Sequence, residues 1–170
     1  MDSKQKIYVA FSNELLVFSA LYMVPGIIGV YNDLKAYDKT KVSILCLLIL
    51  SFIPVFVVID MIEGRIVYPI DNLQHTNEIN NLLFEIVNGG FHMIYLLFFV
   101  CSSIFMVIDF KIRKKILTIV VSVIIGFSNI IGSYPWILST EVRIITEVLF
   151  SFWFIYLGVC VSKVQRLAKV

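Results

Sequence analysis

Residues 82–108 read LLFEIVNGGFHMIYLLFFVCSSIFMVI, an apolar run whose first half contains Glu85, Asn88 and His92. An α-helix completes a turn about every 3.6 residues, so side chains three, four and seven positions apart lie on one face. The three polar side chains therefore form a single stripe on an otherwise apolar helix. This stretch predicts a membrane-spanning helix with a polar face, and the rest of the chain is interpreted around it.

The composition of the whole chain agrees with a membrane protein. Of its 170 residues, 59% are apolar and only 15% are charged, and the mean hydropathy is strongly positive. Soluble domains are more polar than this. A run of about 20 apolar residues spans a hydrocarbon core of roughly 30 Å, and the chain has about five such runs. We expect an all-α, polytopic integral membrane protein, a single bundle over residues 1–170 with transmembrane helices at 7–31, 42–61, 82–108, 116–131 and 144–161.

The first of these segments has two alternative interpretations. A secretory signal peptide is disfavoured because Glu14 interrupts the apolar run and Pro25-Gly26 stands where a small-residue cleavage site would follow. A re-entrant or surface helix over 7–31 would leave four spans. The connections between the other spans would lie on the same sides of the membrane with four spans as with five.

The distribution of Lys and Arg predicts the orientation. The connections at 32–41 and 109–115 contain three and four of these residues, the tail beyond 161 contains three, and the connections at 62–81 and 132–143 contain one each. Positive residues are retained in the cytoplasm. We therefore expect the N-terminus outside, the C-terminus cytoplasmic, and 62–81 as the longest outer loop.

This orientation places the acidic residues of the spans in the outer half of the bundle. A charge in hydrocarbon costs a few kcal/mol even on lenient scales, so such residues usually face the bundle interior or water. We expect an outward-facing acidic vestibule that narrows toward His92 near the midplane. Its predicted lining is Glu14, Asp60, Glu85, Asn88, His92, Asn129 and Glu147.

Structural explanations compete with this hypothesis. Glu85 and Glu147 each begin a span, where a helix N-terminus stabilises an anion. Arg143 lies four residues before Glu147, the spacing at which the two side chains pair on one helix. The two asparagines can bond to neighbouring helices instead of a ligand.

Several classes of site are disfavoured. The two histidines lie far apart and belong to no zinc motif, and no phosphate-binding loop or haem attachment site occurs, so we expect no metal and no cofactor. Cys46, Cys101 and Cys160 are widely spaced, which predicts free thiols. No basic face suggests nucleic acid. The excess of Ile over Ala is typical of an AT-rich genome, and we expect the inner membrane of a bacterium.

Three functional hypotheses remain. The first is a transport or binding component for a cation, a proton or a small molecule, acting in a homo-oligomer or larger membrane complex because the chain is short. The second is a non-catalytic membrane subunit or regulator that packs against a partner membrane protein. The third is an intramembrane enzyme that uses Glu85 and His92 as acid and base. The sequence favours a non-enzymatic role.

Overall fold

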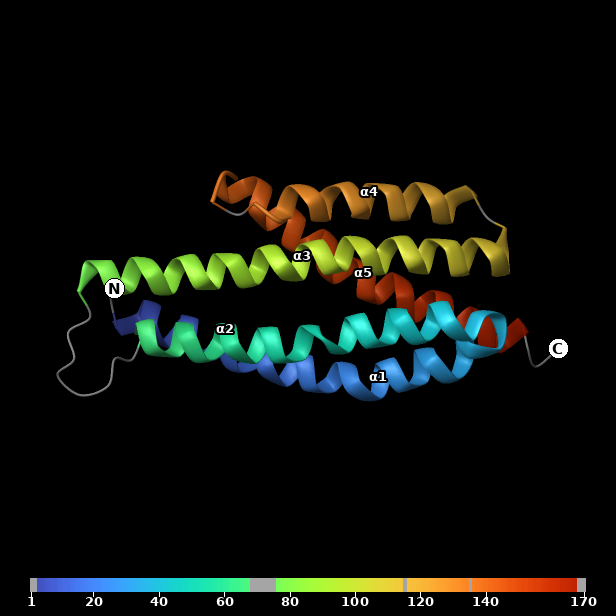
Figure 1. Cartoon of the computed structure of the whole chain (residues 1–170), viewed down its shortest axis with the longest axis horizontal. Coiled ribbons are helices and arrows are strands. Elements are labelled where there is room, and N and C mark those ends of the chain that lie inside the picture. Colours follow the sequence, from blue (N-terminus) through green and yellow to red (C-terminus); the bar gives the residue numbers. More distant parts are fainter. Residues whose placement is uncertain (1–2, 68–75, 115, 135, 168–170) are drawn as a thin grey trace.

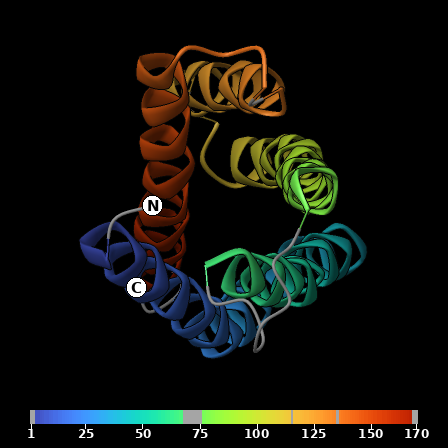
Figure 2. The ribbon, with the colours of Figure 1, turned by 90° about the vertical axis from the view of Figure 1, so that its left-hand side faces the viewer.

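The computed structural model describes residues 3–67, 76–114, 116–134 and 136–167, and within them it contains helices and no strand. The all-helical prediction is confirmed. Figure 1 shows the helices lying roughly along one axis, and Figure 2 shows them end-on, with α3 between α2 and α4. The elements are α1 (Ser3–Leu50), α2 (Phe52–Val67), α3 (Asn77–Arg113), α4 (Ile116–Gly132) and α5 (Thr140–Leu167).

Helix α1 reverses direction at Asp38, whose φ of −162° and ψ of 86° are not helical. The Asp38 carboxylate accepts the backbone N–H of Lys41 at 3.2 Å, as an N-cap residue does for the helix that it begins. Beyond the turn, the Cys46 thiol lies 3.8 Å from the carbonyl oxygen of Ile27. The two legs of α1 are therefore antiparallel, as Figure 1 shows.

The second leg of α1 continues in the same direction into α2 after a break at Ser51. Pro54 causes this break, because it has no N–H to donate to the carbonyl of Leu50 four residues earlier. At this break the Ser51 hydroxyl donates to the carbonyl of Leu48 at 2.6 Å. The segment predicted at 42–61 is thus formed by two helices that continue in one direction.

Helix α3 forms the centre of the core, and the residues at its two ends determine where it begins and stops. Thr76 caps its N-terminus, and Lys114 ends it in the left-handed conformation with φ of 52°. Both boundaries lie outside the predicted 82–108. The buried face of α3 packs aromatic rings against α5, since the Phe98 ring centroid lies 4.2 Å from Phe150 and 4.6 Å from Trp153. Phe98 and Trp153 are fully buried by these contacts.

The helices have the length and composition of membrane spans. Within the part of the chain that the structure describes, three stretches are long and apolar enough to cross a bilayer, Val17–Ile66, Asn77–Arg113 and Thr140–Ser162, and α4 is a shorter apolar helix. The side of α4 that faces away from the bundle exposes Leu117, Val120, Ile124, Phe127 and Ile131. Such an apolar outer face is stable against lipid and not against water. The chain therefore has the character of a membrane protein.

The region predicted as the longest outer loop is largely helical where it is described. Helix α2 continues to Val67 and α3 begins at Asn77, so only a short connection separates them. Residues 68–75, which include His75, lie outside the described residues. All three cysteines are buried and free, as expected.

Candidate functional site

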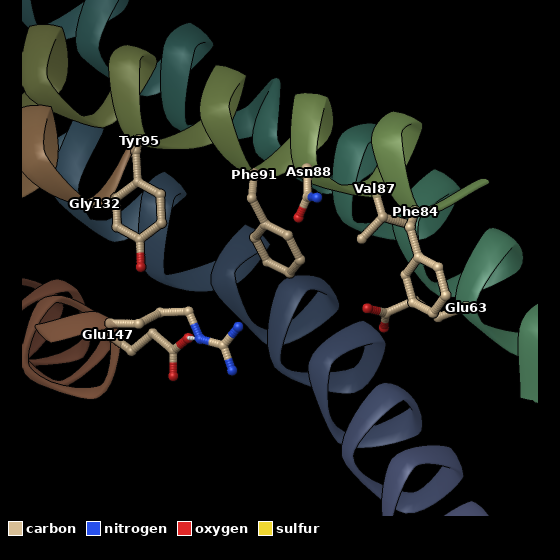
Figure 3. Close-up of a pocket in the computed structure, with 9 residues that line it drawn as sticks. Glu63, Phe84, Val87, Asn88, Phe91, Tyr95, Gly132 and Glu147 are labelled. Carbon is tan, nitrogen blue, oxygen red and sulfur yellow. Dashed lines mark ion pairs between the residues drawn. The ribbon is translucent and has the colours of Figure 1, made fainter. Parts of the chain in front are cut away.

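A cavity of about 310 Å³ opens near the end of the bundle where α2 ends and α3 begins, here called the α2–α3 end. Most of its wall comes from α3, with contributions from α2, α4 and α5. Figure 3 shows these side chains converging on a common space. The lining consists of Glu63, Phe84, Val87, Asn88, Phe91, Tyr95, Gly132, Arg143 and Glu147.

The polar part of the cavity is predominantly acidic. The carboxylates of Glu63 on α2 and Glu147 on α5 lie on opposite sides, with Phe91 and Asn88 between them (Figure 3). The Arg143 Nε lies 3.6 Å from Glu147 Oε1, and the two side chains are 54% and 59% exposed. An ion pair this exposed is weak, because solvent screens it. Glu147 is therefore available to a ligand cation at small cost.

The floor of the cavity is made of aromatic rings. Tyr95 is buried, and its ring centroid lies 5.6 Å from that of Phe150. Phe150 in turn stacks on Phe98, which contacts Trp153. Phe105 continues this column toward Tyr156 near the opposite end of the bundle. These rings fill the bundle below the cavity and give it a closed bottom.

Gly132 allows this floor to form. A Cβ atom added to Gly132 would lie 3.0 Å from Cε1 of Tyr95 and 3.1 Å from Cβ of Thr146. These distances are shorter than ordinary carbon–carbon contacts, so a side chain at this position would push Tyr95 or Thr146 aside by a few tenths of an ångström. Glycine at the end of α4 therefore lets Tyr95 of α3 and Thr146 of α5 approach each other beneath the cavity.

The structure brings together only part of the predicted vestibule. Asn88 and Glu147 line the cavity. Asp60 lines a different hollow, of about 460 Å³, together with Arg65. Glu85 and Glu14 are exposed, and neither appears among the residues that line the cavity. Glu63 and Arg143 take part in the site although neither was among the predicted lining residues.

His92 faces the connection between α4 and α5 instead of the cavity. Its Nδ1–H donates a hydrogen bond to the carbonyl oxygen of Ser133. Its ring centroid lies 5.2 Å from that of Tyr134 and 5.6 Å from that of Trp136. The imidazole therefore holds this connection against α3.

The length of α4 explains why Glu85, Asn88 and His92, which share one face of α3, lie in different environments. Helix α4 ends at Gly132, well short of the α2–α3 end, so the chain turns beside His92 (Figure 1). Glu85 lies two turns further along α3, beyond α4, where its side chain is exposed. The sequence prediction measured the depth of His92 along its own helix, which placed it near the midplane, and it assigned the three polar residues to one environment because they share a helix face.

Asn129 is buried inside the bundle, with 1% of its surface exposed. Neither atom of its side-chain amide has a hydrogen-bond partner among the described residues. It shares the packed face of α4 with Ser122 and Gly126, and it does not line the cavity.

A second polar cluster lies at the opposite end of the bundle, the α3–α4 end. Asp109 is 2% exposed and pairs with Arg113 one turn later on α3. The Thr118 hydroxyl of α4 donates to Asp109 at 2.6 Å. Arg113 also reaches the Tyr156 hydroxyl at 3.2 Å and the Cys160 sulfur at 2.8 Å on α5. The cluster ties three helices together.

Sequence reasoning missed this cluster because it treated residues 109–115 as a basic loop. One signal could have revealed it. Asp109 and Arg113 have the i, i+4 spacing of a helical ion pair at the end of an apolar run. The contributions of α4 and α5 have no comparable signal in the sequence.

Comparison with protein-family models, with curated proteins and with solved structures finds no match to this chain. Among the described residues, no group of three or more His, Cys, Asp and Glu side chains is arranged to hold a metal ion. The function is therefore argued from the geometry of the cavity.

Proposed function

We propose that the chain is a single bundle of five membrane spans, with the N-terminus outside and the C-terminus cytoplasmic. The reversal at Asp38 supports this, because it divides the long apolar stretch Val17–Ile66 into two legs. Lys111 of α3 donates to the carbonyl of Tyr37 at 3.3 Å, which brings the basic connections at 32–41 and 109–115 to the same end. Positive residues favour the cytoplasmic side, so the cavity opens outward.

We further propose that this outer cavity binds a small organic cation. The observation that carries the proposal is the combination of two carboxylates, Glu63 and Glu147, with the aromatic rings of Phe84, Phe91 and Tyr95 in one hollow. Carboxylates attract an ammonium group, and aromatic faces stabilise it through cation–π contact. A hydrated metal ion would favour several converging oxygens over phenyl rings.

The aromatic floor favours binding over open conduction. The rings from Tyr95 to Phe105 occupy the centre of the bundle, so a cation entering from outside meets packed side chains. Transport would require a second conformation or a further chain. The proposed role is therefore a cation-binding component, alone or in an oligomer or larger membrane complex.

Binding of choline and tetramethylammonium to the purified protein in lipid nanodiscs tests the proposal. Glu147→Gln removes one carboxylate and keeps the shape, and we expect a loss of affinity of about tenfold, the equivalent of ~1.4 kcal/mol. Glu141→Gln is the matched control, since Glu141 lies six residues earlier on α5, is exposed and does not line the cavity. Equal binding by the parent and both variants would exclude the site, as would the absence of binding.

A second candidate is a membrane subunit that packs against a partner. The first part of α1 favours it, because none of its described side chains between Ile7 and Ser19 is buried. Ile7, Phe11, Leu15 and Phe18 form one exposed apolar stripe there, with Glu14 beside it. Stoichiometric copurification of a second membrane protein, lost on Phe11→Ser and Leu15→Ser substitution, would support this candidate over the first.

A further inference from the structure

The described lining of the cavity comes from α2, α3, α4 and α5. Figure 1 shows α5 beginning beside α4 and ending near the reversal of α1, so the two helices diverge toward the α2–α3 end. Figure 2 shows the same separation end-on. No described side chain of α1 lines the cavity, and Ala20 is the first buried residue among the side chains of that helix whose burial is described.

A second hollow lies on the outward side of α5 and shares Glu147 with the cavity. It has a volume of about 350 Å³ and is otherwise mostly apolar, lined by Ile144, Val148, Ser151, Phe152 and Ile155. Glu147 thus stands where an acidic, aromatic cavity meets an apolar groove on the lipid-facing surface.

The groove is shallow and runs lengthwise along one face of α5. Ile144 and Ile155 stand at its two ends on one helix. At a rise of 1.5 Å per residue, they are separated by roughly 16 Å along the axis of α5. The apolar side chains between them are exposed, as those of Val148 and Phe152 show.

We propose that the ligand of this site is an amphiphilic amine that enters sideways from the outer leaflet of the membrane. This inference rests on the proposed function and names its ligand class. The ammonium group lies between Glu147 and Glu63 against the rings of the cavity. The hydrocarbon chain lies along α5 in the groove of Ile144, Val148 and Phe152. The carboxylates favour a cationic head over an anionic one, and the Arg143 guanidinium donates hydrogen bonds to the phosphate or carboxylate of a zwitterionic head.

The charge of Glu147 is consistent with this role. A carboxylate on a lipid-facing groove is unfavourable unless water or a cation accompanies it. Arg143 neutralises it only in part, since their separation is 3.6 Å and both side chains are exposed. An ammonium head would complete the neutralisation, and its chain would cover the apolar groove, so both parts of one molecule are stabilised together.

The experiment measures the binding of alkyltrimethylammonium ions of increasing chain length, from tetramethylammonium to dodecyltrimethylammonium, to the protein in nanodiscs of phosphatidylcholine. We expect the dodecyl compound to bind at least tenfold more tightly than tetramethylammonium. Phe152→Ala should weaken the dodecyl compound several-fold and leave tetramethylammonium unchanged. Phe127→Ala is the matched control, because Phe127 is equally exposed on α4 and lies outside both hollows. Each ligand partitions into the nanodisc lipid to the same extent whichever variant is present. Partitioning therefore cancels when one variant is compared with another.

Each alternative outcome has a distinct meaning. Binding that is independent of chain length would overturn the amphiphile and leave the proposed cation site standing. Absence of binding by all the ammonium ions would overturn both. Dodecyl sulfate bound as tightly as the ammonium compound, with no effect of Glu147→Gln, would show only an apolar surface and overturn the inference. Efficient disulfide formation between two Phe152→Cys chains, unaffected by the dodecyl compound, would assign the groove to a second copy.

Discussion

The Thr118 hydroxyl of α4 donates a hydrogen bond of 2.6 Å to the carboxylate of Asp109 on α3, inside the bundle at the α3–α4 end. Asp109 also pairs with Arg113, whose guanidinium reaches Tyr156 and Cys160 of α5. A buried charge with a partner is tolerable, whereas the same charge without one is not. The cluster therefore holds the three helices in one arrangement.

Asp109→Ala is expected to destabilise the protein by about 3–5 kcal/mol, because it leaves the Arg113 charge buried without its carboxylate. Thermal or denaturant unfolding in detergent measures the loss. The double variant Asp109→Leu with Arg113→Met should recover much of it, since neither charge remains. A loss under about 1 kcal/mol for Asp109→Ala would contradict the argument.

Gly132→Ala is expected to destabilise the fold by about 1–3 kcal/mol, because the new methyl group would lie 3.0 Å from Tyr95 and 3.1 Å from Thr146 and would displace them. Gly158→Ala is the control. A Cβ at Gly158 has no atom within 4 Å, and alanine is the better helix former by about 1 kcal/mol. The two variants should thus move the unfolding midpoint in opposite directions. A shift of the same sign in both would refute the packing explanation.

His92→Ala is expected to loosen the α4–α5 connection, because the ring donates to the carbonyl of Ser133 and packs on Tyr134 and Trp136. Loss of one partly buried hydrogen bond together with its ring contacts corresponds to about 1–3 kcal/mol. Hydrogen exchange of the amides in the connection should accelerate. Met93→Ala, an exposed neighbour on α3, should leave the exchange unchanged. Equal exchange in both variants would exclude the role given to His92.

The reversal of α1 should depend on pH through Asp38. The hydrogen bond from Lys41 holds the pKa of Asp38 below its ordinary value of 3.8, and Lys111 adds a weaker attraction. A carboxyl with a lowered pKa in the folded state stabilises that state above its unfolded pKa and loses this contribution as the pH falls through the folded pKa. The stability difference between the parent and Asp38→Asn should be constant near neutrality and shrink below pH 3.8. A difference that does not change on acidification would show that the charge contributes nothing.

The helices were predictable because their signal is local. The apolar runs predict the helices, Pro54 accounts for the break between α1 and α2, and Asp38 has the residue type of an N-cap. The boundaries were less predictable, since α3 extends past 82–108 by polar residues that cap it. The candidate site was predicted in part, through Asn88 and Glu147. Glu63 had been assigned to a loop, and the helical end of α2 brings it to the cavity.

The sequence alone determined that this chain forms apolar helices, and it determined which residues share a face of each helix, because periodicity depends only on the residues of one segment. The tertiary structure decided which faces meet. The short α4 turned His92 toward Ser133 and left Glu85 outside, and the tilt of α5 placed Glu147 at the edge of the cavity. Relative helix lengths and tilts come from packing between segments, and packing is a property of pairs of helices that no single run of residues contains.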